Sequence, residues 1–134
     1  MNLDFSLEPT LTAKEFQSIL ISSTLATRRP AQDLPRLDKM LRAADLIVAA
    51  RANGKLVGIS RAITDFSYCC YLSDLAVDVE YQRRGIGRRL IDETHQAAGL
   101  DTTLILVAAP AAEAYYPKIG LTHLPSCWAI PRQG

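Results

Sequence analysis

Apolar and polar residues are spaced along the chain in a way that separates strands from helices. Over 2–8, apolar residues alternate with polar ones, the pattern of a strand with one buried face. Helical spacing then predicts one helix from about 12 to 27 and a second over 33–44. Two strand-like runs, 46–52 and 55–64, follow directly. The first half of the chain therefore predicts the order β-α-α-β-β.

Polar residues at the ends of these segments support the same boundaries. Thr12 and Glu15 have the spacing of a capping box at the start of the first helix. Asp33 is suited to cap the second helix. Asn53-Gly54 joins the two strand-like runs, and both residues tolerate the positive φ of a two-residue hairpin turn. These two strands are therefore expected to pair antiparallel.

The second half of the chain begins with another strand-like run over 68–77. Apolar residues then recur with helical spacing over 86–99. The continuous apolar run 103–108 is typical of a strand that is covered on both faces. A short helix is predicted over 111–118, and the tail predicts one or two edge strands around Trp128.

The complete order is β-α-α-β-β-β-α-β-α-β, which predicts an α/β fold with a mixed sheet. The strand–helix–strand unit over 68–108 is expected to form a right-handed crossover with parallel strands, whereas the earlier strands join as hairpins. The chain has 134 residues, 49% of them hydrophobic and 22% charged, which is ordinary for a globular protein. We therefore expect a single domain over 1–134.

Charge and composition exclude several classes of function. The net charge of +1 gives no overall basic field for nucleic acid. No apolar run approaches the ~20 residues of a membrane span, and the N-terminus lacks the pattern of a secretory signal. The three cysteines, Cys69, Cys70 and Cys127, show neither CxxC spacing nor a cluster with histidine, so no metal site is expected. These observations predict a cytoplasmic protein with reduced thiols.

The glycine-containing segment 82–87 lies between the strand 68–77 and the helix that follows it. The first N–H groups of a helix have no partner within it, and the helix dipole places partial positive charge there. Gly85 and Gly87 would let a ligand approach these amides closely. We therefore expect an anion site that could hold phosphates.

Four arginines lie at this helix start: Arg83, Arg84, Arg88 and Arg89. The helix dipole disfavours cations at this end, and a bound polyanion would remove that conflict. The alternative is that these are solvated surface charges on good helix formers. Two well-known phosphate loops do not fit, because no Lys-Ser or Lys-Thr follows Gly87 and Leu90 stands where the dinucleotide fingerprint needs a third glycine.

The segment Leu75-Ala76-Val77, followed by Glu80-Tyr81 and the turn 82–87, resembles the central motif of the GNAT superfamily of acyl-CoA-dependent N-acetyltransferases. The resemblance covers residues 75–121, and the order of elements along the whole chain agrees with it. It implies a GNAT-like single domain that transfers an acetyl group from acetyl-CoA to a primary amine by direct attack on the thioester. The resemblance also leaves a homodimer open as the assembly.

The resemblance implies contacts to coenzyme A from two segments. Backbone amides of the turn would hold the pyrophosphate, and the central strand would present its backbone to the pantetheine arm and the acyl carbonyl, where the family's strand carries a bulge. The residues implied are Leu75, Ala76, Val77, Gln82, Arg83, Arg84, Gly85, Ile86, Gly87 and Arg88. The side chains of Leu75 and Val77 are expected to be part of the core.

A second motif, over 114–121, resembles the family's segment after the fifth strand. On that match Tyr116 takes the position of the tyrosine that protonates the departing thiolate, and Tyr115 is the local alternative. A hydroxyl near the sulfur can donate its proton as charge develops there. The general base is less clear, and Asp74, directly before Leu75, is the nearest candidate.

The acceptor is not fixed by the sequence. Four arginines of the first two helices and the loop between them, Arg28, Arg29, Arg36 and Arg42, would suit an anionic acceptor. Asp65 and Asp74 would instead favour a cationic amine, so the signals conflict. A small-molecule amine is the default expectation because no surface charge run suits a large partner.

Two other functions compete with acetyl transfer. One is a domain that binds acyl-CoA without catalysis, as a sensor or interaction module. The other is a nucleic-acid-binding module that uses the arginine cluster at the helix start. Turnover with an amine panel separates the first from an enzyme, and salt-dependent duplex binding without CoA affinity would support the second.

Overall fold

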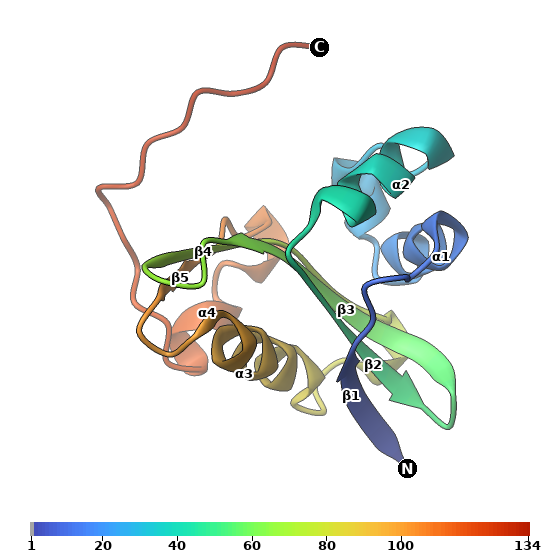
Figure 1. Ribbon diagram of the computed structural model, residues 1–134. Coiled ribbons are helices and arrows are strands. Elements are labelled where there is room, and N and C mark those ends of the chain that lie inside the picture. The colour runs from blue at the N-terminus through green and yellow to red at the C-terminus, as the bar shows by residue number, and fades with distance from the viewer. Residues whose placement is uncertain (1) are drawn as a thin grey trace.

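The computed structural model describes residues 2–134 and shows one five-stranded sheet with helices on both faces (Figure 1). The strands are β1 (Leu3–Leu7), β2 (Leu46–Ala52), β3 (Lys55–Thr64), β4 (Cys69–Val77) and β5 (Thr103–Ile105). The helices are α1 (Ala13–Ser22), α2 (Leu34–Ala43), α3 (Ile86–Ala98) and α4 (Tyr115–Lys118). Short 3-10 helices are η1 (Leu25–Arg28), η2 (Val79–Tyr81) and η3 (Pro110–Ala112).

The strands lie side by side in chain order, β1 to β5. The first four pair antiparallel, and β5 runs parallel to β4 after the crossover through α3. The predicted mixed α/β sheet is therefore confirmed. Of the described residues, no helix is both long and apolar enough to cross a lipid bilayer.

Two hydrophobic cores lie on opposite faces of this sheet. On one face α1 and α2 bury residues such as Phe16 and Leu37 against Ile47 and Ile59. On the other face α3 packs on the sheet, as Figure 1 shows. Gly58 of β3 permits this approach, because an added Cβ would lie 3.0 Å from the Leu90 side chain.

In the first half of the chain, the predicted helix caps and the predicted hairpin turn are confirmed. The capping box of Thr12 and Glu15 is present, and the Asp33 side chain accepts a hydrogen bond from the backbone N–H of Arg36. Asn53 and Gly54 adopt positive φ in the hairpin turn between β2 and β3. One prediction was wrong, since α1 ends at Ser22 instead of about 27.

The early end of α1 has a local cause. Thr24 adopts a left-handed φ of 70°, which a continuing right-handed helix does not allow. The Ser23 hydroxyl donates to the Leu20 carbonyl and accepts from the Leu25 N–H. The chain then forms η1, so the segment before α2 is a turn that carries Arg28 at its end.

The sheet separates between β4 and β5. Their pairing ends at Tyr71 and Ile105, while β4 continues to Val77 against β3. The register of β4 on β3 shifts at the same point, because Arg61 faces Asp74 but Ala62 faces Leu72. Ser73 is the extra residue of this bulge. An opening therefore begins on β4 directly after its last residue paired with β5.

The C-terminal quarter differs from the sequence expectation. β5 ends at Ile105, and Val107 is exposed, so the predicted strand over 103–108 with two covered faces was wrong. The helix expected over 111–118 is divided into η3 and α4. No strand forms around Trp128, whose side chain is 90% exposed; of the described chain, β5 is the last strand.

The tail has a physical reason for this difference. Pro125 lies in a turn closed by the Cys127 N–H and the Leu124 carbonyl, 3.2 Å apart, which interrupts any extended run. Beyond α4 the chain continues as a tail that pairs with no strand of the sheet (Figure 1). The free edge of β5 is therefore not paired with the tail, and the faces of β5 stay only partly covered.

Candidate active site

The turn between β4 and α3 has an unusual backbone. Asp78 follows the last residue of β4, and its side chain accepts a hydrogen bond from the Glu80 N–H at 2.9 Å, which caps the start of η2. The Gln82 side-chain amide donates to the Val77 carbonyl at 3.1 Å. Arg83 and Gly85 then adopt left-handed φ values of 64° and 78°. The chain reverses direction within a few residues, and the first backbone N–H groups of α3 face this turn.

The start of α3 presents backbone N–H groups toward this turn. The Arg89 N–H makes the first bond within the helix, to the Gly85 carbonyl at 3.1 Å. The N–H groups of 86–88 precede it and have no acceptor in the helix, but that of Arg88 is engaged by the Tyr115 hydroxyl. A Cβ added at Gly85 would meet nothing within 4 Å, so the space beside this glycine is open. This turn and the N–H groups of 86 and 87 could hold an anion, and we name the feature the anion cradle.

The arginines around the turn do not all face it. Arg88 lies 3.9 Å from Asp92 and Arg89 lies 3.2 Å from Glu93, each pair one helical turn apart. The Arg89 guanidinium also stacks over the Phe5 ring, and that of Arg84 over Tyr81. The carboxylates of Asp92 and Glu93 thus partly balance the positive charge of the arginines at the start of α3.

The central strand lies beside the opening in the sheet. Ala76 is buried in the core under α1 and α2, while Leu75 and Val77 are half-buried against the core under α3. The side chains therefore belong to the core, as expected. On one edge this strand pairs with β3, and on the other edge β5 has no residue opposite 72–77. The backbone of this stretch can therefore bind an extended ligand in the opening.

The two tyrosines of α4 occupy different positions. The Tyr115 hydroxyl lies 3.1 Å from the place of a Cβ on Gly87, so Tyr115 packs against the start of α3. Burial raises the pKa of Tyr115, although a hydrogen bond from the Arg88 N–H acts in the opposite direction. Burial also raises the pKa of Tyr116, whose ring contacts that of Tyr115 edge-on at 5.3 Å between centroids. Both hydroxyls keep their proton at neutral pH.

Asp74 is completely buried at the bulge of β4. Arg29 Nε donates to one carboxylate oxygen at 2.5 Å, and Arg61 Nε donates to the other. Arg29 and Arg61 also hold the carbonyl and the hydroxyl of Ser73. The carboxylate is thus fixed between two guanidinium groups that come from η1 and β3.

A cavity of about 400 Å³ opens beside this group. Its wall is formed by η1 and the loop after it, α2, β3, β4, the chain after β5, and the tail. Ser73 and Val107 flank the point at which β4 and β5 separate, so the cavity adjoins the opening in the sheet. It lies on the α1–α2 side of the sheet, opposite α3.

The sequence indicated part of this cavity but missed Arg61, Tyr71 and Ser73. A single arginine inside the apolar strand 55–64 was the available signal, because a buried charge needs a partner. The structure separates the two aspartates that were expected near the acceptor. Asp65 instead accepts hydrogen bonds from three backbone N–H groups of its own turn, at Ser67, Tyr68 and Cys69.

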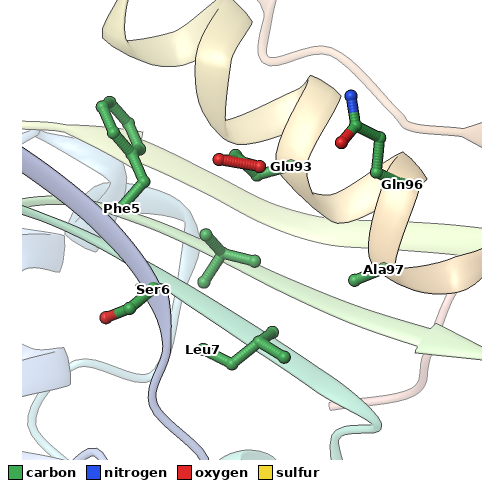
Figure 2. Close-up of a pocket in the computed structure, with 7 residues that line it drawn as sticks. Phe5, Ser6, Leu7, Glu93, Gln96 and Ala97 are labelled. Atoms are coloured by element: carbon green, nitrogen blue, oxygen red, sulfur yellow. The ribbon is translucent and has the colours of Figure 1, made fainter.

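A second cavity lies between β1 and α3 (Figure 2). Phe5 and Leu7 form one side, and Glu93, Gln96 and Ala97 form the other. The carboxylate of Glu93 is paired with Arg89. This hollow does not include the turn 82–87, the opening in the sheet or either tyrosine of α4. We therefore do not assign the chemistry to it.

Among residues 2–134 there is no group of three or more His, Cys, Asp or Glu side chains placed to hold a metal ion. The cysteines are free thiols, with Cys70 buried and Cys69 and Cys127 exposed.

Comparison with known proteins identifies the family of this chain. Residues 22–126 match the family model described as "Acetyltransferase (GNAT) domain". An uncharacterized N-acetyltransferase, ycf52, from Pyropia yezoensis is 32% identical over 84 residues, which cover 60% of this chain and 47% of that protein. The matched region thus spans about half the length of this curated relative.

Solved structures agree in fold. A GNAT family acetyltransferase, SP0256 from Streptococcus pneumoniae TIGR4, superposes with a TM-score of 0.79 at 17% identity, covering 99% of this chain and 98% of that one. The aminoglycoside N-acetyltransferase AAC(6')-Iy, solved in complex with CoA, gives a TM-score of 0.75 at 14% identity, covering 99% and 96%. The solved structures show the fold, and the family match over 22–126 shows that the chain belongs to the GNAT family of acetyltransferases.

Proposed function

We propose that this protein is an acyl-CoA-dependent N-acetyltransferase that transfers the acetyl group of acetyl-CoA to a primary amine of a small molecule. One observation carries the proposal: the anion cradle at the start of α3 leads into an opening between β4 and β5, with a cavity on the opposite side of the sheet. A phosphate-bearing thioester and an amine can thus approach each other from two sides.

The residues present fit coenzyme A. The open space beside Gly85 and the leading amides of α3 suit a pyrophosphate. The unpaired edge of 72–77 suits the amides of a pantetheine arm, as a strand edge binds an extended chain. Bound there, acetyl-CoA supplies an acyl group activated as a thioester. Gln82 contributes by holding the end of β4 in place.

The reaction needs one proton donor and the loss of one amine proton. The amine nitrogen attacks the thioester carbonyl, the carbon–sulfur bond breaks, and the leaving thiolate takes a proton. We assign this proton to the Tyr116 hydroxyl, and burial, by raising its pKa, keeps that hydroxyl protonated until the sulfur becomes basic. Tyr115 is the competitor, although its hydroxyl is already engaged by the Arg88 amide.

The role of Asp74 as the base stays a prediction. Each of its oxygens already accepts a hydrogen bond from an arginine, and it is completely buried. This pairing favours a positioning role, in which Asp74 holds Arg29 and Arg61 at the wall of the cavity. The proton of the ammonium would then leave through water.

The test combines binding with turnover. Calorimetry measures CoA binding, and a thiol-reactive dye measures CoA release from acetyl-CoA with a panel of primary amines. We expect CoA binding together with amine-dependent release. Binding without turnover across the panel would favour the acyl-CoA sensor, and absence of CoA binding would refute both functions.

A further inference from the structure

The cavity beside Asp74 is lined by arginines from separate parts of the chain. Arg28 and Arg29 come from η1 and its end, Arg36 from α2, Arg61 from β3, and Arg132 from the tail. No Asp or Glu is among the described residues that line it. Asp74, behind the wall, is one carboxylate against five guanidinium groups. The cavity therefore carries a strong excess of positive charge.

Asp74 fixes two of these arginines without cancelling the charge. It binds Arg29 and Arg61 together, so one negative charge is shared by two positive ones. Arg29 also donates to the carbonyls of Arg28 and Ser73, both at 2.8 Å. These contacts immobilise both guanidinium groups before any ligand arrives. Preorganised donors of this kind lose little freedom on binding.

The other three arginines of the cavity, Arg28, Arg36 and Arg132, have no carboxylate within 4 Å among residues 2–134. Other arginines of the protein do have carboxylate partners, as Arg51 has in Glu8 and Glu15. Like charges that gather on a concave wall repel one another, and an anion bound among them relieves that repulsion.

The remaining wall is apolar and the space is small. Leu25, Pro30, Met40 and Val107 line it together with the Tyr71 ring and the Ser73 hydroxyl. A volume of about 400 Å³ suits a small molecule more than a folded partner. The cavity adjoins the opening at Ser73, where the proposed thioester would lie, so an anion held by the arginines would point its amine at that opening.

From this geometry we infer that the acceptor is a small primary amine that also carries a carboxylate or a phosphate group, which the arginine cavity binds. The inference rests on the proposed function and names its substrate class. The conflict between arginine and aspartate signals disappears, because Asp65 is in a distant turn and Asp74 is engaged by arginines. A polycationic amine is disfavoured by the same charge.

The positive charge of the cavity also affects how the acceptor amine loses its proton. Neighbouring cations lower the pKa of an ammonium group, because they disfavour its charged form. The groups that face the cavity are the five arginines and the Tyr71 hydroxyl, with Asp74 behind them. An amine bound here therefore loses its proton to water more readily than in solution, and the site needs no free carboxylate.

The test uses two matched pairs of amines: β-alanine against β-alaninamide, and O-phosphoethanolamine against ethanolamine. Thiol release with acetyl-CoA gives kcat/KM for each compound, and calorimetry on the CoA-loaded protein gives its binding without turnover. In at least one pair we expect kcat/KM for the anionic amine to be about tenfold or more above that for its uncharged analogue. One hydrogen bond to a charged group is strong enough for a difference of this size. The pair that responds distinguishes carboxylate from phosphate.

Arg36→Gln and Arg28→Gln should bring the ratio of kcat/KM between the anionic amine and its uncharged analogue toward one. Lys39→Gln is the matched control, because Lys39 is a cation on the same helix as Arg36 but does not line the cavity. It should leave the ratio unchanged. Spermidine should be a poorer acceptor than the favoured anionic amine.

The outcomes separate the two proposals. Turnover that is equal within both pairs and insensitive to both arginine variants would overturn the inference and leave the acetyltransferase intact. Arginine-dependent binding of an anionic compound without turnover of any amine would refute the proposed function and support the anion site. Weaker binding of CoA itself in Arg36→Gln would overturn the inference, because the arginines would then belong to the cofactor.

Discussion

Gly85 offers a sharp test of the anion cradle because the chain contains a matched control. Gly85 has a φ of 78° and Gly54 a φ of 86°, and a Cβ added at either glycine meets nothing within 4 Å. Gly85 lies at the start of α3, whereas Gly54 lies in the turn between β2 and β3. The same substitution at the two positions should cause the same backbone strain, but only the one at Gly85 places a side chain beside the anion cradle.

The stability effects of Gly85→Leu and Gly54→Leu should be alike. A residue with a side chain in the left-handed region costs about 1–2 kcal/mol relative to glycine. In a domain of this size that lowers the melting temperature by on the order of 5 °C. Neither variant should unfold at room temperature, and thermal unfolding followed by circular dichroism measures both shifts.

The binding effects should differ. A leucine at Gly85 fills the open space beside the leading amides of α3, so a phosphate loses at least one of their hydrogen bonds. A hydrogen bond to a charged group is worth about 1.5–3 kcal/mol, which corresponds to a loss of roughly 10- to 100-fold in CoA affinity. Gly54→Leu should keep the affinity of the unaltered protein. Equal CoA affinity in the two variants, measured by calorimetry, would refute the assignment of the cradle.

Three further predictions concern other residues. Tyr116→Phe should lower the single-turnover rate roughly 100-fold or more without weakening CoA binding; an unchanged rate in this variant with a crippled Tyr115→Phe would reassign the acid. Asp74→Asn should lower the free energy of unfolding, measured with urea, by about 3–5 kcal/mol, since it leaves the buried Arg61 and the partly buried Arg29 unpaired; a fully stable variant would contradict this network. Three backbone N–H groups lower the pKa of Asp65 to about 2, below its ordinary 3.8, so its contribution to stability is present above about pH 4 and is lost as the pH falls toward 2. Asp65→Asn should remove that component of the acid dependence of the melting temperature, and an identical pH profile would contradict it.

Much of the fold followed from contacts between residues close in sequence. The capping box at Thr12, the hairpin at Asn53-Gly54 and the glycine turn at Gly85 each depend on neighbours within about four residues. Such features form wherever their residues stand, so the sequence pattern predicts them. The same holds for the antiparallel pairs β2–β3 and β3–β4, because short connections join these consecutive strands.

The tail and β5 show where local reasoning failed. An apolar run over 103–108 is compatible with a strand, but a strand is supported by hydrogen bonds from its neighbours, and the tail offers none to the free edge of β5. Pairing with a distant segment depends on the loop between them and on the alternatives for both edges. The pattern of apolar and polar residues over 121–130 carries no information on that loop or on the competing partners.

The sequence by itself determined the mixed sheet, the glycine turn and, through its resemblance, the family. Only the tertiary structure decided the charge of the arginine-lined cavity, because Asp74 meets Arg29 from 45 positions away and Arg61 through a bulge that shifts the register of β4. Charges interact by distance in space and by burial, neither of which is a property of sequence spacing.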